Sequence, residues 1–397
     1  MHVLGGESAL RALRAVRCRQ LSVRLPLPEV EPPVVSLPGQ EQKAPEPSQE
    51  EWWCGPTLAD EGFPFGSAET NGSVDLHRLG DVGKFTREAP LELMVFDYAH
   101  RTTRKKTRTR VLSQEVPARA LVCVDPTLYF ACPELVVLQM SARLGPVALA
   151  QLIMELCGSY SLAPDPDGRE GATFDIPPVT TIDRIRSCAK HVRARGGTTT
   201  LGWALRYALE RSASPGETTL ALMMSLPPEE GGYGFGVPVL NGRVDVPANL
   251  EACVAGGPFY PDVFLQGGYV DLEYQSTEFH LDPLAVASLT MVREGLETAD
   301  PELAAWRRDF IAKGDSDLRR TRDLQLLGLH VVPVTGFDLR EPERMDQVAC
   351  AVARHLAGEG LLDWEPWHAS LEARDYRELR AHLLRSCLPL SPKKTAP

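Results

Sequence analysis

The segment 261–280 reads PDVFLQGGYVDLEYQSTEFH and constrains the fold more than any other part of the chain. It predicts two short antiparallel strands joined at Gly267 and Gly268, because two adjacent glycines favour a tight hairpin turn. Counting outward from this turn pairs Asp262 with Glu273. Directly opposed residues in such a ladder have Cβ atoms roughly 5 Å apart. The sequence therefore predicts two carboxylates side by side on neighbouring strands.

Alternation of side chains along the second strand sets the surroundings of this acid pair. Three polar residues share one face, and three apolar residues share the face that indicates core: Asp271, Glu273 and Gln275, against Val270, Leu272 and Tyr274. Like charges this close repel each other, so we expect a cation between the carboxylates. Oxygen ligands favour Mg²⁺, Mn²⁺ or Ca²⁺ over zinc. Asp262 and Glu273 are the predicted metal ligands.

An acid that heads one strand, followed by an acid-x-polar triplet in the next, resembles the restriction-endonuclease-like, PD-(D/E)xK superfamily. The similarity is greatest to domains related to very-short-patch-repair endonucleases and to type IV abortive-infection antitoxin-like proteins of actinobacteria. It covers roughly residues 212–340 and rests on an ordered set of residues: Asp262, Glu273, Gln275, His280, Asp317, Arg320, Leu327-Gly328 and the valine-rich run 331–335. The resemblance implies a mixed sheet flanked by helices.

The chain departs from the family pattern in two places. Gln275 stands where a lysine or an acid usually positions or activates the water. The 36 residues from 281 to 316 separate His280 from Asp317, where the family has far fewer. The first departure bears on catalysis, and the second indicates an insertion.

The resemblance also implies a role for each matching residue. Asp262 and Glu273 would hold Mg²⁺ or Mn²⁺, and His280 would orient or deprotonate the attacking water. Arg320, held by Asp317, would contact the phosphate. Gln275 cannot act as a base but could orient water.

Plainer roles remain open for the same side chains. His280 alone is more often a structural histidine. Asp317 and Arg320, spaced i, i+3, make an ordinary helix ion pair. The family also implies that Glu217, in the run Ser214-Pro215-Gly216-Glu217, faces the active site; the alternative is a carboxylate that caps its own helix.

The predicted function is a divalent-metal-dependent endonuclease that cleaves DNA phosphodiester bonds, with DNA and a cognate toxin or defence-system protein as partners. The alternative is a regulator, antitoxin-like or DNA-binding, whose nuclease-like domain has lost turnover. Gln275 and a pI near 5.4 favour that alternative. A third interpretation of the function is a scaffold or protein-interaction module.

The predicted fold class is α/β, with four segments. Residues 1–88 form a flexible, proline-rich arm that contains a short amphipathic helix at 8–18, and residues 89–211 form an α+β domain. Residues 212–358 form the restriction-endonuclease-like domain. Residues 359–397 form a helical extension and tail.

A net charge of −11 argues against a basic surface over the whole molecule, so DNA binding requires a local basic patch or a contact bridged by a metal ion. Residues 101–110, RTTRKKTRTR, carry six basic residues in ten and could contact phosphates, or could form a solvated hairpin tip. Nine cysteines without C-x-x-C spacing indicate free thiols in a reducing, cytoplasmic setting. No apolar run reaches the length of a membrane span.

Overall fold

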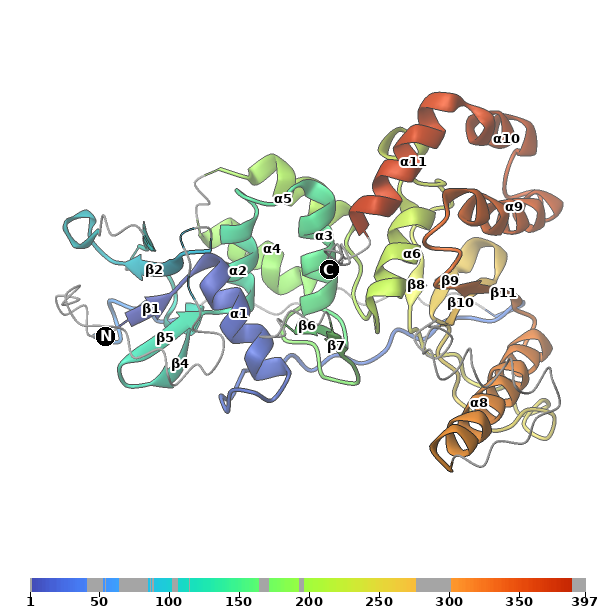
Figure 1. Ribbon diagram of the computed structural model, residues 1–397, viewed down its shortest axis with the longest axis horizontal. Helices are drawn as coiled ribbons and strands as arrows, with labels where there is room; N and C mark the ends of the chain where they lie inside the picture. Colours follow the sequence, from blue (N-terminus) through green and yellow to red (C-terminus); the bar gives the residue numbers. More distant parts are fainter. Residues whose placement is uncertain are drawn as a thin grey trace. The chain divides into compact units, whose positions relative to one another are not determined.

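The computed structural model describes residues 2–40, 53, 55–63, 85, 87, 89–101, 106–113, 115–163, 171–192, 196–275 and 301–387. The chain divides into two compact units (Figure 1). The first unit comprises Met1–Val30, Glu46–Thr218 and Pro389–Pro397, and the second comprises Glu31–Pro45 and Thr219–Leu388. Each unit combines helices with a mixed sheet, so the predicted α/β class is confirmed.

The first unit contains a five-stranded sheet in the order β3-β2-β1-β5-β4. Its strands are β1 (His2–Leu4), β2 (Leu91–Val95), β3 (Thr107–Val111), β4 (Leu121–Asp125) and β5 (Leu128–Ala131). The central strand β1 pairs antiparallel with β2 and parallel with β5, and its Val3 and Leu4 are buried. The expectation that this end of the chain belongs to a flexible arm is therefore wrong. A three-residue strand is too short to show alternation in the sequence.

Helices follow the apolar periodicity of the first unit. They are α1 (Gly6–Arg17), α2 (Pro133–Met140), α3 (Pro146–Leu156), α4 (Ile182–His191) and α5 (Thr198–Tyr207). The amphipathic helix predicted at 8–18 is confirmed as α1. Helix α3 begins at Pro146 directly after Gly145, and α5 begins at Thr198 directly after Gly196-Gly197. A short antiparallel pair, β6 (Ser161–Ala163) with β7 (Gly171–Thr173), follows α3.

Two arginines of α1 attach this helix to the end of α3. Arg14 donates from Nε and Nη2 to the buried carboxylate of Glu155, at 2.9 and 2.6 Å. Arg17 donates to main-chain oxygens of Glu155 at 2.7 Å and of Gly158 at 2.8 Å. Both guanidinium groups thus fix the register between the two helices.

The second unit contains a four-stranded sheet in the order β11-β10-β9-β8. Its strands are β8 (Val239–Leu240), β9 (Val263–Leu265), β10 (Val270–Gln275) and β11 (His330–Thr335). The first three are antiparallel neighbours, and β11 is parallel to β10.

The turn between β9 and β10 differs from the predicted two-glycine hairpin. Gln266–Gly268 form a 3₁₀ turn, and Tyr269 follows with a left-handed φ of 52°. A Cβ on Gly268 would lie 2.2 Å from Cδ2 of Leu356. Glycine at 268 therefore serves the close approach of another helix.

Helices α8 (Pro301–Leu326) and α9 (Pro342–Gly358) flank the strands; in Figure 1, α9 lies above them and α8 below. Phe264 of β9 and Val331 of β11 belong to one apolar cluster with Leu324 of α8, and this cluster also contains Val35 and Leu37 from the early extended segment. The face of the sheet that carries Phe264 and Val331 is thus covered by α8 and residues 35–37.

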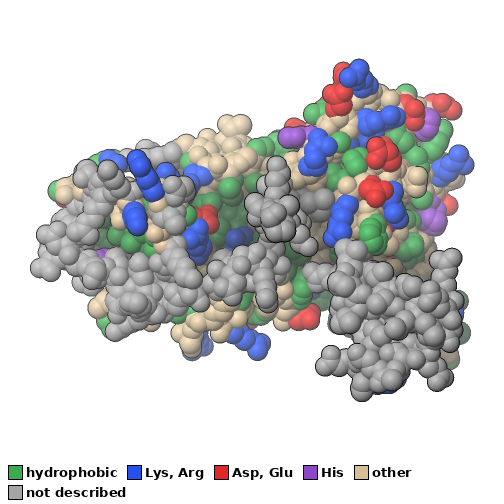
Figure 2. All heavy atoms as spheres, in the orientation of Figure 1, with side chains coloured by type: hydrophobic (Ala, Val, Ile, Leu, Met, Phe, Trp, Pro, Cys, Tyr) green, Lys and Arg blue, Asp and Glu red, His purple; other side chains and the backbone are tan. Residues whose placement is uncertain are grey.

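Helices α10 (Trp364–Glu372) and α11 (Arg374–Cys387) are part of the second unit. The buried Arg380 donates to Asp346 of α9 at 2.9 Å and to the main-chain oxygen of Leu371 at 2.6 Å. Trp367 donates from Nε1 to the main-chain oxygen of Tyr233 at 3.0 Å. On the face shown in Figure 2, this helical region carries acidic, basic and histidine side chains intermixed. Within the described part of the chain, every helix is too short or too polar to span a membrane.

Candidate active site

The ladder between β9 and β10 has the register expected from the sequence. Val263 pairs with Leu272 and Phe264 with Asp271, so the next pair outward is Asp262 with Glu273. The main-chain N–H of Tyr274 donates to Oδ2 of Asp262 at 2.8 Å, which ties this carboxylate across the ladder. The sheet thus places Asp262, Asp271 and Glu273 on the face covered by α8.

Asp271 is the most deeply buried acid of this group. Its side chain is 0% exposed, and neither carboxylate oxygen has a hydrogen-bond partner among the described residues. Its ladder neighbours, Phe264 and Val331, belong to the apolar cluster under α8. Burying a carboxylate in such a place without a partner is strongly unfavourable.

Burial raises the pKa of Asp271 well above its ordinary value, and the charges of Glu273 and Asp262 raise it further. Arg320 opposes this rise. Once protonated, Asp271 could donate a hydrogen bond to Glu273, which also favours the neutral form. The Asp271 carboxyl is therefore a group that needs either a proton or a cation.

Arg320 of α8 supplies positive charge to the cluster. It donates from Nε and Nη2 to the two oxygens of Glu273, at 2.6 and 2.8 Å, and from Nη2 to the main-chain oxygen of Tyr260 at 2.5 Å. Burial lowers the pKa of Arg320, but the hydrogen bonds and charge of Glu273 outweigh burial and hold that pKa above its ordinary value. Charges on Asp262 and Asp271 act in the same direction.

This geometry corrects the expected role of Asp317. Arg320 was expected to be held by Asp317, three residues earlier on the same helix. It crosses to Glu273 instead, whose side chain is only 10% exposed. An ion pair with a nearly buried acid, made through two parallel hydrogen bonds, is stronger than a solvated pair along a helix.

The acids lie together, yet they do not form a ready metal centre. Among the described residues, no group of three or more His, Cys, Asp or Glu side chains is arranged to hold a metal ion. Arg320 occupies both oxygens of Glu273, whereas the two oxygens of Asp271 have no hydrogen-bond partner within the described part of the chain. The donor chemistry of three carboxylates suits Mg²⁺ or Mn²⁺.

The other predicted site residues have different outcomes. Gln275 ends β10 opposite Thr335, half-buried, on the strand face of Asp271 and Glu273. His280 lies outside the described residues. Glu217 caps its own helix, α6 (Pro215–Ser225): its carboxylate accepts from the Ala213 N–H at 2.9 Å and the Ser214 hydroxyl at 3.0 Å. The capping role left open by the sequence is thus the one observed.

Asp271 is the residue that sequence reasoning did not include among the site residues. The signal was present, because alternation places it on the face of Glu273. Its depth was not visible, since that depends on α8 and on residues 35–37 far away in the chain.

The basic run 101–110 lies partly outside the described residues, at 102–105. Its second half enters β3, an edge strand that is parallel to β2, so these two strands do not form the hairpin of the alternative interpretation. Arg108 is exposed, whereas Nε of Arg110 lies 3.9 Å from the buried carboxylate of Glu92. Arg143 also bonds to Glu92. Contact with DNA by this run stays a prediction.

Comparison with family models, with curated proteins and with solved structures finds no match to this chain.

Proposed function

We propose that the second unit is a nuclease-like domain that hydrolyses DNA phosphodiester bonds with the help of a divalent cation. The observation that carries the proposal is the Asp271 carboxylate, which is fully buried, lacks hydrogen-bond partners among the described residues, and lies beside Asp262 and Glu273. Sites that perturb a pKa through burial and like charge together are candidates for chemistry.

Asp262, Asp271 and Glu273 are the residues that would hold Mg²⁺ or Mn²⁺. When bound, such an ion neutralises phosphate charge and makes a bound water more acidic. Arg320, released from Glu273, has the planar fork that suits two phosphate oxygens. Gln275 would orient water through its amide, which both donates and accepts.

The order of elements in the second unit supports the same proposal. The antiparallel strands β9 and β10 lead through α8 into the parallel strand β11, followed by α9. This is a mixed sheet flanked by helices, as the restriction-endonuclease-like resemblance implies. Asp262 directly precedes β9, and Asp271 and Glu273 lie on β10.

A second candidate function is binding of DNA or a protein partner without hydrolysis. Two observations favour it: Arg320 occupies both oxygens of Glu273, and Gln275 supplies no base. In such a regulator the guanidinium would be the permanent counter-charge of the cluster.

The deciding experiment follows cleavage of mixed single- and double-stranded DNA, together with thermal melting, in Mn²⁺, in Mg²⁺ and in chelator. For the endonuclease, metal raises the melting temperature, the wild type cuts, and Asp271→Asn lowers the rate at least a hundredfold. Asp317→Asn is the control, because it removes an acid of α8 that does not pair with Arg320. A metal concentration of a hundred times the dissociation constant raises the free energy of unfolding by about 2.7 kcal/mol.

The other outcomes separate the two candidates. Metal stabilisation and DNA binding without cleavage would favour the regulator. If millimolar metal leaves the melting temperature of both the wild type and Asp271→Asn unchanged, the cation site itself is refuted.

A further inference from the structure

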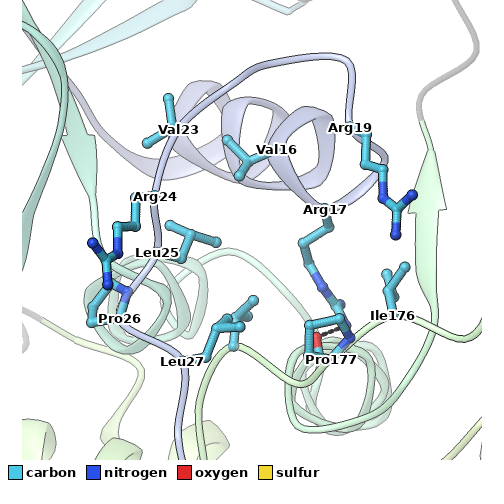
Figure 3. A pocket seen from close by; sticks show the side chains of 11 residues that line it. Val16, Arg17, Arg19, Val23, Arg24, Leu25, Pro26, Leu27, Ile176 and Pro177 are labelled. Carbon is cyan, nitrogen blue, oxygen red and sulfur yellow. Dashed lines mark hydrogen bonds between the residues drawn. The ribbon is translucent and has the colours of Figure 1, made fainter.

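The first unit contains a pocket of about 850 Å³, which the proposed function does not use. It is bounded by the end of α1, by the extended residues 23–27 and by residues 176–179 (Figure 3). Ligand pockets have volumes of about 300–1,000 Å³. This pocket is therefore large enough to hold a small organic molecule.

Three arginines, Arg17, Arg19 and Arg24, line this pocket, and none of the described lining residues is acidic. Arg19 and Arg24 are exposed, and neither has a carboxylate partner within the described part of the chain. The rest of the wall is apolar, with Leu25 and Leu27 prominent. In a chain with a net charge of −11, three arginines at one pocket without an acidic residue among the described lining form a local exception.

Arg17 is held in a way that leaves its charge without a direct counter-ion. It is 5% exposed, and its Nη atoms donate to main-chain oxygens of Glu155, Gly158 and Pro177 at 2.7, 2.8 and 3.3 Å. Its Nε is buried without a hydrogen-bond partner among the described residues. Burial lowers the pKa of Arg17, although the charge of Glu155 opposes this. An anion in the pocket would relieve that penalty.

The backbone after α1 turns Arg19 toward the same pocket. Arg19 has a left-handed φ of 58°, and the N–H groups of Gln20 and Leu21 both donate to the Ala15 oxygen, at 2.8 and 3.1 Å. Figure 3 shows Arg17 and Arg19 on one side, Arg24 on the other, and leucine side chains between them. Positive charge thus surrounds an apolar floor.

We propose that this pocket binds a small organic anion, a carboxylate or a phosphate monoester, that carries an apolar chain. The head group lies beside Arg17 and Arg19, and the chain lies against Leu25, Leu27 and Ile176. Arg24 adds positive charge on the opposite side of the leucines. Guanidinium groups bind either head group through paired hydrogen bonds. The apolar wall makes a purely inorganic anion a poorer ligand.

The experiment is calorimetric titration of the full chain with decanoate, hexyl phosphate, inorganic phosphate and uncharged decanol, all below their aggregation limits. We expect decanoate or hexyl phosphate to bind at least tenfold more tightly than decanol and inorganic phosphate. Which of the two binds better identifies the head group. Equal affinity for decanoate and decanol, or no binding of either amphiphile, would overturn the proposal, and this comparison needs no variant.

Variants locate the binding. The double change Arg19→Asn and Arg24→Gln removes two exposed charges, and asparagine tolerates the left-handed backbone at 19. It should weaken the anion at least tenfold, and Leu27→Ser should weaken it severalfold. Arg206→Gln, at an exposed arginine of α5, is the control and should change nothing. Affinity that survives the double change would show that the anion binds elsewhere.

Discussion

Two buried carboxylates, one in each unit, have opposite surroundings. Glu155 of the first unit is 1% exposed and accepts hydrogen bonds from Arg14 at 2.9 and 2.6 Å, from the Ser161 hydroxyl at 3.2 Å and from the Leu162 N–H at 3.0 Å. Asp271 of the second unit is 0% exposed and accepts none among the described residues. Both side chains are almost fully buried, so the two acids differ in their hydrogen-bond partners and not in their burial.

The difference shows how to separate a structural acid from a functional one. A buried carboxylate whose oxygens all accept hydrogen bonds joins elements of the fold. Its removal leaves a buried positive charge without a counter-charge. A buried carboxylate without partners weakens the fold, which makes it a candidate for a role in chemistry. The two acids should therefore respond to mutation with opposite signs.

The largest effect is expected from Glu155→Gln. This change leaves the partly buried Arg14 without its counter-charge, so the free energy of unfolding should fall by about 3 kcal/mol. Urea denaturation of the two proteins measures it. If the loss stays below about 1 kcal/mol, Glu155 does not stabilise the attachment of α1 to α3 that its hydrogen bonds indicate.

Arg320→Gln should have the next largest effect. It removes the main counter-charge of Glu273, so the metal-free protein should lose about 2 kcal/mol of stability. The same change should enlarge the stabilisation by Mn²⁺, because Arg320 no longer competes for Glu273. Melting curves with and without Mn²⁺ measure both effects; an unaltered metal response would show that Arg320 and the cation do not share this site.

Asp271→Asn should act in the opposite direction and raise metal-free stability at neutral pH by about 1–2 kcal/mol. The raised pKa of Asp271 favours the protonated form in the fold. Its contribution to stability is present below the unfolded pKa and is lost as the pH rises through the folded pKa. The gain from Asn over the wild type should thus grow with pH. A gain that does not vary with pH would contradict the raised pKa.

The smallest effect concerns His330 and His355, whose rings stack at 4.0 Å between centroids. Burial, and then the charge of His355, lower the pKa of His330. A histidine whose pKa is lower in the folded protein than in the unfolded chain destabilises the fold as the pH falls below the unfolded pKa, near 6.5. His355→Gln should reduce this acid loss, by less than about 1 kcal/mol. Urea denaturation of both proteins at pH 7 and pH 5 tests this prediction. If the free energy of unfolding falls equally in the two proteins, the histidine pair does not cause the loss of stability in acid.

The register of β9 and β10 could be predicted from the sequence, because side chains alternate with a period of two and the apolar run on each side of the glycines is short. The partner of Arg320 could not, since Arg320 lies on α8, 47 residues along the chain from Glu273. Likewise, β1 has only three residues and takes its partners from residues 91–95 and 128–131. Local patterns predict local pairs, whereas the depth of Asp271 depends on distant segments.

The apolar cluster over Asp271 has a consequence for dividing the chain. Val35 and Leu37 come from a segment that precedes most of the first unit, and Val35 is tied by its N–H to the Arg243 oxygen at 2.8 Å. A fragment that starts at residue 219 would lack both side chains and would leave Phe264 and Leu324 without part of their cover. The chain passes between the units more than once, so no single peptide bond separates them. Expression of either unit alone therefore requires rejoining distant segments with a new linker.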